Sequence, residues 1–134
     1  MARTLYGECR GETLDGVIGG GYTIKNRAAR PKRFGFTIAE VCRKPLQFSC
    51  WNPDDANYPL LLAANIEQPA FMRCLGAAAL VLSGGVPDPT QGADHYWTVA
   101  APSWAKLWPP EWSAAMIKTV IIDHHQFARE VVSA

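Results

Sequence analysis

The apolar positions near the start of the chain predict a short helix followed by a longer one. The short helix covers roughly residues 2–9. The longer helix begins at a capping residue, either Thr13 or Asp15, and continues to about residue 29, because Pro31 cannot extend it. Its small and apolar residues recur four, three and four positions apart, which is the spacing of one buried helical face: Val17, Gly21, Ile24 and Ala28.

Three consecutive glycines, Gly19 to Gly21, lie within this longer helix. Each glycine costs about 1 kcal/mol relative to alanine inside a helix. A run of three therefore indicates that another backbone passes very close, and we expect that backbone to be the first helix. A kink in the longer helix is the alternative explanation.

The middle of the chain predicts a short helix and then a loop. Residues 37–40 form a capping box, and the helix that they open ends before Pro45. Residues 46–55 have the polar side chains and the proline that are typical of a loop. This loop carries Gln47 and Phe48, an amide and an aromatic side chain of the kind that often lines a carbohydrate groove. A hydrophobic anchor is an equally ordinary role for Phe48.

A second long helix is predicted to begin at Asn65, with Gln68 in the capping-box position. Gly84 is expected to end it, because glycine readily adopts the left-handed backbone that closes many helices. The residues expected to face the core are Phe71, Cys74, Leu75, Ala78 and Leu82.

The C-terminal third lacks helical periodicity. Residues 84–92 are typical of turns, and residues 94–112 alternate aromatics with prolines and are expected to be irregular. Residues 118–129 contain the run 120–122 of Val and Ile and are expected to be extended, with a last helix as the alternative. The expected fold class is mainly α, α+β at most, in a single domain over residues 1–134. No repeat, linker or wall-binding module is indicated.

Composition and charge narrow the function classes. A chain of 134 residues that is 49% hydrophobic can bury a core without staples. The formal net charge of +1 argues against a nucleic-acid partner, and the one basic run, residues 27–33, can simply complement the dipole at a helix C-terminus. The longest apolar run, residues 77–82, is too short to span a membrane. The N-terminus lacks an apolar signal sequence, so synthesis in the cytoplasm is expected.

No metal or cofactor is expected. Four residues invite a zinc interpretation: Asp94, His95, Asp123 and His124. However, the sequence contains no His-Glu-x-x-His pattern, and adjacent histidines seldom bind one ion together. The four cysteines lack Cys-x-x-Cys spacing and are expected to be free, buried thiols: Cys9, Cys42, Cys50 and Cys74. A thiol hydrolase that pairs Cys9 or Cys50 with a later histidine remains an open alternative.

Two carboxylates, Glu8 and Glu12, stand four residues apart at the end of the first predicted helix. Gly11 favours a helix end between them, which would present Glu8 where the next element begins. Glutamates at helical spacing are usually solvated, so this pair alone is a weak catalytic signal.

Five short motifs that follow one another along the chain strengthen the catalytic interpretation of this pair. They are Gly7-Glu8-Cys9-Arg10-Gly11-Glu12, Asn26-Arg27, Gln47-Phe48-Ser49, Asp88-Pro89-Thr90 with Gly92-Ala93-Asp94-His95-Tyr96, and Ile122-Asp123-His124-His125-Gln126-Phe127. Together they resemble the SleB-like cell wall hydrolase family, which includes spore cortex-lytic enzymes and related phage lysins. The resemblance extends from about residue 2 to residue 129, and the order of the motifs makes it specific.

The resemblance implies a compact, lysozyme-like or lytic-transglycosylase-like fold that cuts the glycan of bacterial peptidoglycan. Glu8 would be the catalytic acid at the linkage between N-acetylmuramic acid and N-acetylglucosamine. Such cleavage needs a carboxylic acid that is protonated near neutral pH, and apolar neighbours such as Tyr6, Phe48 and Tyr96 favour the neutral form. The residues expected to bind substrate or support Glu8 are Glu12, Gln47, Phe48, Thr90, Asp94, His95 and Tyr96.

The reaction outcome depends on a second carboxylate. Hydrolysis with two carboxylates would require one about 5–10 Å from the first, and Glu12 and Asp94 are the candidates. A lytic transglycosylase needs only Glu8, and the lytic transglycosylase is the preferred hypothesis. The alternatives are an amidase or cysteine peptidase that acts on the peptide side, and a non-catalytic protein that binds peptidoglycan. If the protein is an enzyme, it is expected to reach the cell wall after release from the cytoplasm, through a holin or another route.

Overall fold

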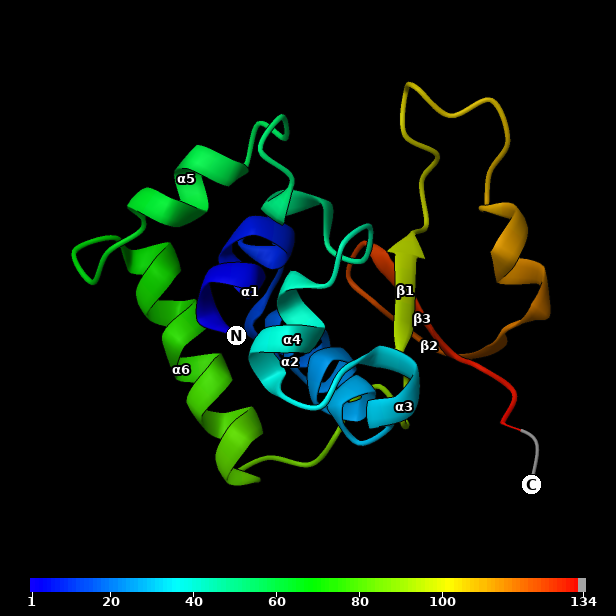
Figure 1. Cartoon of the computed structure of the whole chain (residues 1–134), viewed down its shortest axis with the longest axis horizontal. Coiled ribbons are helices and arrows are strands. Elements are labelled where there is room, and N and C mark those ends of the chain that lie inside the picture. The colour runs from blue at the N-terminus through cyan, green and yellow to red at the C-terminus, as the bar shows by residue number, and fades with distance from the viewer. Residues whose placement is uncertain (133–134) are drawn as a thin grey trace.

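The computed structural model describes residues 1–132 and shows a group of helices beside a three-stranded sheet (Figure 1). The helices are α1 (Ala2–Cys9), α2 (Leu14–Ala28), α3 (Pro31–Phe34), α4 (Ile38–Arg43), α5 (Tyr58–Ala63) and α6 (Pro69–Ser83). Two short 3₁₀ helices are η1 (Ser49–Trp51) and η2 (Glu111–Ala115). The strands are β1 (His95–Thr98), β2 (Ile117–Ile122) and β3 (His125–Arg129). No helix in residues 1–132 is both long enough and apolar enough to cross a membrane.

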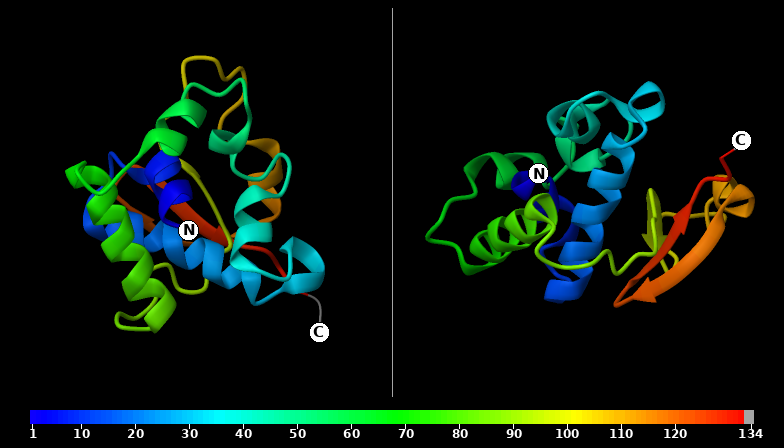
Figure 2. Two further views of the ribbon diagram at one scale, coloured as in Figure 1. Left: turned by 60° about the vertical axis from the view of Figure 1, so that its left-hand side comes forward. Right: turned by 90° about the horizontal axis from the view of Figure 1, so that it is seen from below.

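Helix α2 lies between the other helices and the sheet (Figure 2). The hydroxyl of Thr13 caps its N-terminus by accepting a hydrogen bond from the backbone N–H of Gly16 at 3.4 Å. Every residue from Gly16 to Ile24 is buried, because α2 packs against α1, α4 and α6 as well as against the sheet. The predicted bounds of α1 and α2 and the capping role of Thr13 are confirmed.

The three glycines of α2 each face a different neighbour. A Cβ atom on Gly19 would lie 2.8 Å from the ring of Phe127 on β3, and one on Gly21 would lie 2.9 Å from Val81 on α6. A Cβ atom on Gly20 would lie 2.8 Å from Sγ of Cys9 on α1. The predicted close approach of the first helix is therefore found at Gly20 alone, and side chains rather than backbone make it.

The sheet has the strand order β1-β3-β2, and both pairs are antiparallel. β3 is the central strand, and it buries Phe127 and Ala128. The prediction of extended structure near residues 118–129 is confirmed as two strands. The prediction that residues 94–112 are irregular is wrong for residues 95–98, which form β1. Pairing with β3, a strand about 30 residues later, creates this element, and local sequence gives no sign of it.

Helix α6 begins later than predicted. Its first residue is Pro69, and Asn65 instead closes the preceding turn: its side chain accepts from the N–H of Glu67, and its own N–H donates to Gln68, both at 2.9 Å. Gly84 ends the helix with a φ of 71°, as predicted. Leu82 does not face the core, since 52% of it is exposed, and Val81 is buried in its place.

The glycine contacts predict opposite effects of two matched substitutions. Gly20→Ala should lower the free energy of unfolding by about 1–3 kcal/mol, because its methyl group would overlap Cys9 in a packed core. Gly76→Ala, on the exposed side of α6 with open space around it, should raise stability by up to about 1 kcal/mol through helix propensity. Urea unfolding of both variants measures the difference. Equal effects of the two substitutions would contradict the packing role assigned to Gly20.

Candidate active site

A cleft of about 850 Å³ opens between the helices and the sheet. Glu8 lies on its wall at the end of α1, facing residues of the loop that joins α4 to η1. The opposite wall comes from β1 and from the segment around η2. The lining residues are Glu8, Arg27, Arg33, Leu46, Gln47, Phe48, Ser49, Asn52, His95, Tyr96, Trp112, Ala115, Met116, Glu130 and Val131.

The carboxyl group of Glu8 is held from two sides. Its Oε1 accepts a hydrogen bond from the backbone N–H of Cys50, and its Oε2 accepts one from the hydroxyl of Tyr96, both at 3.3 Å. These are long hydrogen bonds, so they orient the carboxyl group without using up its capacity to bind a substrate oxygen.

A glycine beside Glu8 makes one of these contacts possible. A Cβ atom on Gly7 would lie 2.7 Å from Cβ of Cys50 and 3.1 Å from the side chain of Leu61. Without that atom, η1 packs directly on α1 and brings the N–H of Cys50 to Glu8. Gly7 therefore positions the loop wall of the cleft against the helix that carries the candidate acid.

Tyr96 reaches Glu8 from β1. Its ring packs against the rings of His125 and Phe127 on β3, with centroids 4.8 and 5.6 Å away. Burial raises the pKa of Tyr96, and the charge of Glu8 raises it further. The phenol therefore stays protonated and acts as a hydrogen-bond donor to Glu8.

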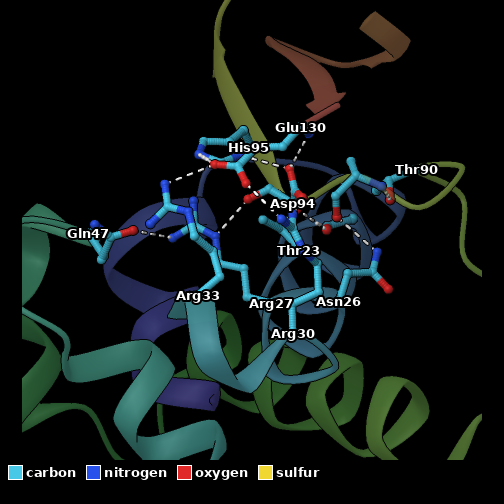
Figure 3. A network of polar contacts seen from close by, with 12 residues as sticks. Thr23, Asn26, Arg27, Arg30, Arg33, Gln47, Thr90, Asp94, His95 and Glu130 are labelled. Atoms are coloured by element: carbon cyan, nitrogen blue, oxygen red, sulfur yellow. Dashed lines mark hydrogen bonds and ion pairs between the residues drawn. The ribbon is translucent and has the colours of Figure 1, made fainter. Parts of the chain in front are cut away.

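A network of charged residues joins the end of α2 to the sheet beside the cleft (Figure 3). Asp94 lies at its centre: Oδ2 pairs with Arg30 at 2.7 Å, and Oδ1 contacts Nδ1 of His95 at 2.8 Å. Oδ1 also accepts from the N–H of Glu130 at 3.0 Å. The side chain of Glu130 pairs with Arg30 at 3.0 Å and with Arg33 at 2.9 Å. The basic run that the sequence explained by the helix dipole thus connects helix, sheet and C-terminal segment.

Burial alone would raise the pKa of Asp94, but hydrogen bonds from His95 and from the N–H of Glu130, together with the charge of Arg30, outweigh it. The net effect lowers the pKa of Asp94. Asp94 is therefore an ionised partner in the network, and it does not line the cleft. The structure thus places Asp94 outside the cleft lining, and its expected role as a supporting residue or second carboxylate beside Glu8 stays a prediction.

Glu12 and Thr90 also lie outside the cleft lining. The buried carboxylate of Glu12 contacts Nδ1 of His124 at 3.0 Å and Nδ1 of His125 at 3.5 Å, where β2 turns into β3. Thr90 is fully buried; its hydroxyl donates to Asp88 at 2.6 Å and closes a turn. The sequence placed both at the site because they belong to motifs that contain cleft residues, but their side chains stabilise connections. The cleft lining does include Gln47, Phe48, His95 and Tyr96. Their expected roles in binding substrate or supporting Glu8 stay predictions.

The cysteines are free and buried, as expected. Burial raises the pKa of Cys9 and of Cys50, and the charge of Glu8 adds to both effects. A thiol under these conditions resists forming the thiolate that a cysteine nucleophile needs. Cys50 contacts Glu8 through its backbone N–H. Within residues 1–132, no three His, Cys, Asp or Glu side chains converge as a metal site would require.

The chain matches the model of a known protein family, described as Cell Wall Hydrolase, over residues 11–128. It belongs to the cell wall hydrolase family. The matched range covers most of the chain and begins three residues after Glu8. The comparison with curated protein sequences gave no significant match.

Two solved structures resemble this cell wall hydrolase. The catalytic domain of the germination-specific lytic transglycosylase SleB from Bacillus anthracis superposes with a TM-score of 0.72 at 26% identity, covering 96% of this chain and 90% of that one. The catalytic domain of the Bacillus cereus SleB protein gives a TM-score of 0.66 at 25% identity, covering 96% and 86%. These matches confirm the predicted family resemblance and the predicted mainly helical, lysozyme-like fold.

Several cleft residues of this cell wall hydrolase were not predicted from its sequence. Trp112 and Met116 reach the cleft from the irregular connection between β1 and β2, and Glu130 reaches it from the residue directly after β3. Arg27 belongs to the Asn26-Arg27 motif, but the sequence did not predict a role for it. Its signal was available: Arg27 lies one helical turn after Ile24 of the predicted buried face and next to Ala28, so its guanidinium must find polar partners inside the fold.

The charged network predicts a pH-dependent stability difference. Asp94→Asn should lower the free energy of unfolding by about 2 kcal/mol at pH 7, because the charges of Arg30 lose a buried partner. A lowered folded-state pKa means that this contribution is complete above the unfolded-state pKa of about 4 and disappears as pH falls through the lower folded value. Urea unfolding at pH 7 and pH 3 measures the loss.

The exposed Asp54 provides the matched control. Asp54→Asn should leave stability unchanged at both pH values, within about 0.5 kcal/mol. A deficit of Asp94→Asn that is equally large at pH 3 and pH 7 would contradict the assignment of Asp94 as an ionised partner.

Proposed function

We propose that this cell wall hydrolase is a peptidoglycan glycosidase, a lytic transglycosylase in which Glu8 is the single catalytic acid and base. The bond cleaved is the one between N-acetylmuramic acid and N-acetylglucosamine. One observation carries the proposal: of the two carboxylates that line the cleft in residues 1–132, Glu130 is in ion pairs and Glu8 is not.

The chemistry requires one group to act twice. In its protonated form, Glu8 donates its proton to the glycosidic oxygen while the bond from that oxygen to C1 of the muramic acid breaks. The glucosamine part then leaves with a new 4-hydroxyl group. The Glu8 carboxylate next takes the proton of the muramic 6-hydroxyl as this oxygen bonds to C1. The product is a 1,6-anhydro sugar, and no water is consumed.

The contacts of Glu8 suit the stage in which its carboxylate acts as the base. The N–H of Cys50 and the hydroxyl of Tyr96 are donors, so they stabilise the carboxylate that remains after the proton has left. They also orient the carboxyl group of Glu8, a residue that lines the cleft. The phenol of Tyr96 keeps this role because its pKa is raised.

The positions of the other carboxylates relative to Glu8 favour transglycosylation over hydrolysis. A hydrolase would need a second carboxylate to activate water or attack the sugar. The candidates from the sequence, Glu12 and Asp94, are engaged with histidine and arginine partners outside the cleft lining. The structural neighbour from Bacillus anthracis is described as a lytic transglycosylase, which supports the same reaction class.

The alternatives from other classes fit the site less well. A cysteine peptidase would use a thiolate, and the buried thiols of Cys9 and Cys50 have raised pKa values. A protein that only binds peptidoglycan would not require an unpaired carboxyl group held by two donors on the cleft wall.

Glu8→Gln should abolish cell wall cleavage while the fold is retained. The amide keeps the shape and the contact with Cys50 but cannot donate the proton, so the rate should fall by at least ~10²–10⁴-fold. Turbidity loss of purified peptidoglycan measures the rate, and the melting temperature checks the fold. Glu12→Gln is the matched control and should lose far less activity, because Glu12 lies outside the cleft lining. Full activity of Glu8→Gln would end the single-acid proposal.

The released fragments should end in 1,6-anhydro-muramic acid. The muramic 6-hydroxyl is held next to C1 by the bound sugar and reacts at a high effective concentration. Mass spectrometry of the digest should therefore show products one water lighter than those of a muramidase. Reducing muramic ends in most fragments would instead indicate hydrolysis, and free peptides with intact glycan strands would indicate an amidase or peptidase.

A further inference from the structure

Arg27 is a buried cation on the cleft wall. Only 6% of it is exposed, and its guanidinium packs against the rings of Phe34 and Phe48, with centroids 5.1 and 4.9 Å away. Its Nε donates to the backbone carbonyl of Asp94 at 2.6 Å, and its Nη1 donates to Oε1 of Gln47 at 3.1 Å. Within residues 1–132, no carboxylate lies within ion-pair distance of it.

A buried guanidinium without a carboxylate partner is costly, because water no longer compensates its charge. The aromatic rings and the two neutral acceptors offset part of this cost. Burial also lowers the pKa of Arg27, which reports the same penalty. In the described part of the chain, Nη2 of Arg27 has no acceptor, although the residue lines the cleft.

Gln47 supplies a second donor at the same place. Its Oε1 is occupied by Arg27, and this contact fixes the orientation of the amide. The Nε2 group is then left to donate, and residues 1–132 provide it with no acceptor. Gln47 also lines the cleft, so the two side chains present adjacent N–H donors of which one carries a positive charge.

The charges around this point leave a positive surplus. Three guanidinium groups, those of Arg27, Arg30 and Arg33, face two carboxylates, those of Asp94 and Glu130. The formal charge of this group is therefore three minus two, or +1. The candidate acid Glu8 lies on another part of the cleft wall.

We propose that Arg27 and Gln47 form a subsite for a carboxylate carried on the lactyl side chain of muramic acid. The inference rests on the proposed function and names the part of the substrate that this site selects. The sugar rings and acetamido groups of the glycan are neutral, so the lactyl side chain is where a negative charge enters. The charge is either the free lactyl carboxylate of a strand without peptides or a carboxylate of an attached stem peptide.

Soluble oligomers of the glycan repeat test the inference. One has free lactyl carboxylates, a second has neutral lactyl methylamides, and two more carry stem peptides with free or with amidated carboxyl groups. The protein should cleave one charged oligomer at least ~10-fold more efficiently than its neutral counterpart, as a charge-assisted hydrogen bond would give. The pair that shows this preference identifies the source of the carboxylate.

Arg27→Met should reduce the ratio of kcat/KM for charged over neutral oligomer to about one, because the charge that distinguishes them is gone. Arg129→Met is the matched control, since Arg129 is exposed and does not line the cleft. It should keep the preference. Gln47→Glu is the second test variant if Arg27→Met fails to fold. It places a carboxylate beside the guanidinium of Arg27, so it should also reduce the ratio to about one.

A failure of the carboxylate subsite and a failure of the proposed function would give different results. If the protein releases 1,6-anhydro products from charged and neutral oligomers with equal efficiency, the carboxylate subsite is wrong and the proposed function stands. A preference that persists in Arg27→Met or Gln47→Glu also overturns the subsite. If none of the oligomers is cleaved, the glycosidase function fails and the subsite fails with it.

Discussion

The contact between α2 and the sheet is the constraint on which the cleft depends. Gly19 has no side chain, so the ring of Phe127 on β3 packs directly against the helix. At and just after the C-terminal end of α2, Arg27 and Arg30 bind the carbonyl and carboxylate of Asp94, the residue that precedes β1. Apolar contact and ionic contact thus fix the same strand pair. Because β1 carries Tyr96, they also fix the distance from this phenol to Glu8.

The carboxylates of this fold differ in their partners and therefore in their roles. Asp94 and Glu130 have lowered pKa values, and they use their charge to hold arginines of the helices. Glu12 is buried against two histidines of the β2–β3 turn. Glu8 meets two neutral donors instead. The contrast in partners separates the carboxylates that stabilise the fold from the one available for proton transfer, although all of them lie within or next to the same motifs.

The cleft is also asymmetric in charge. The candidate acid Glu8 lies on one part of its wall, and Arg27 with its neighbouring arginines gives another part a positive surplus. The rings of Phe34 and Phe48 pack against the planar guanidinium of Arg27 and help to hold it in place. Under the proposed function, this arrangement would let the cleft recognise the reacting bond of a neutral glycan and a charged substituent at separate points.

The sequence by itself determined what local chemistry controls. The ends of α1 and α2, the cap at Thr13 and the end of α6 at Gly84 follow from hydrogen-bonding and backbone preferences within one turn. Ordered motifs also identified Glu8, Gln47, Phe48, His95 and Tyr96 as cleft residues. Tertiary structure alone decided that residues 95–98 form a strand, that Glu12, Thr90 and Asp94 turn away from the cleft, and that Arg27 enters it. The reason is that strand pairing and side-chain direction depend on partners far along the chain, such as β3, which no local pattern specifies.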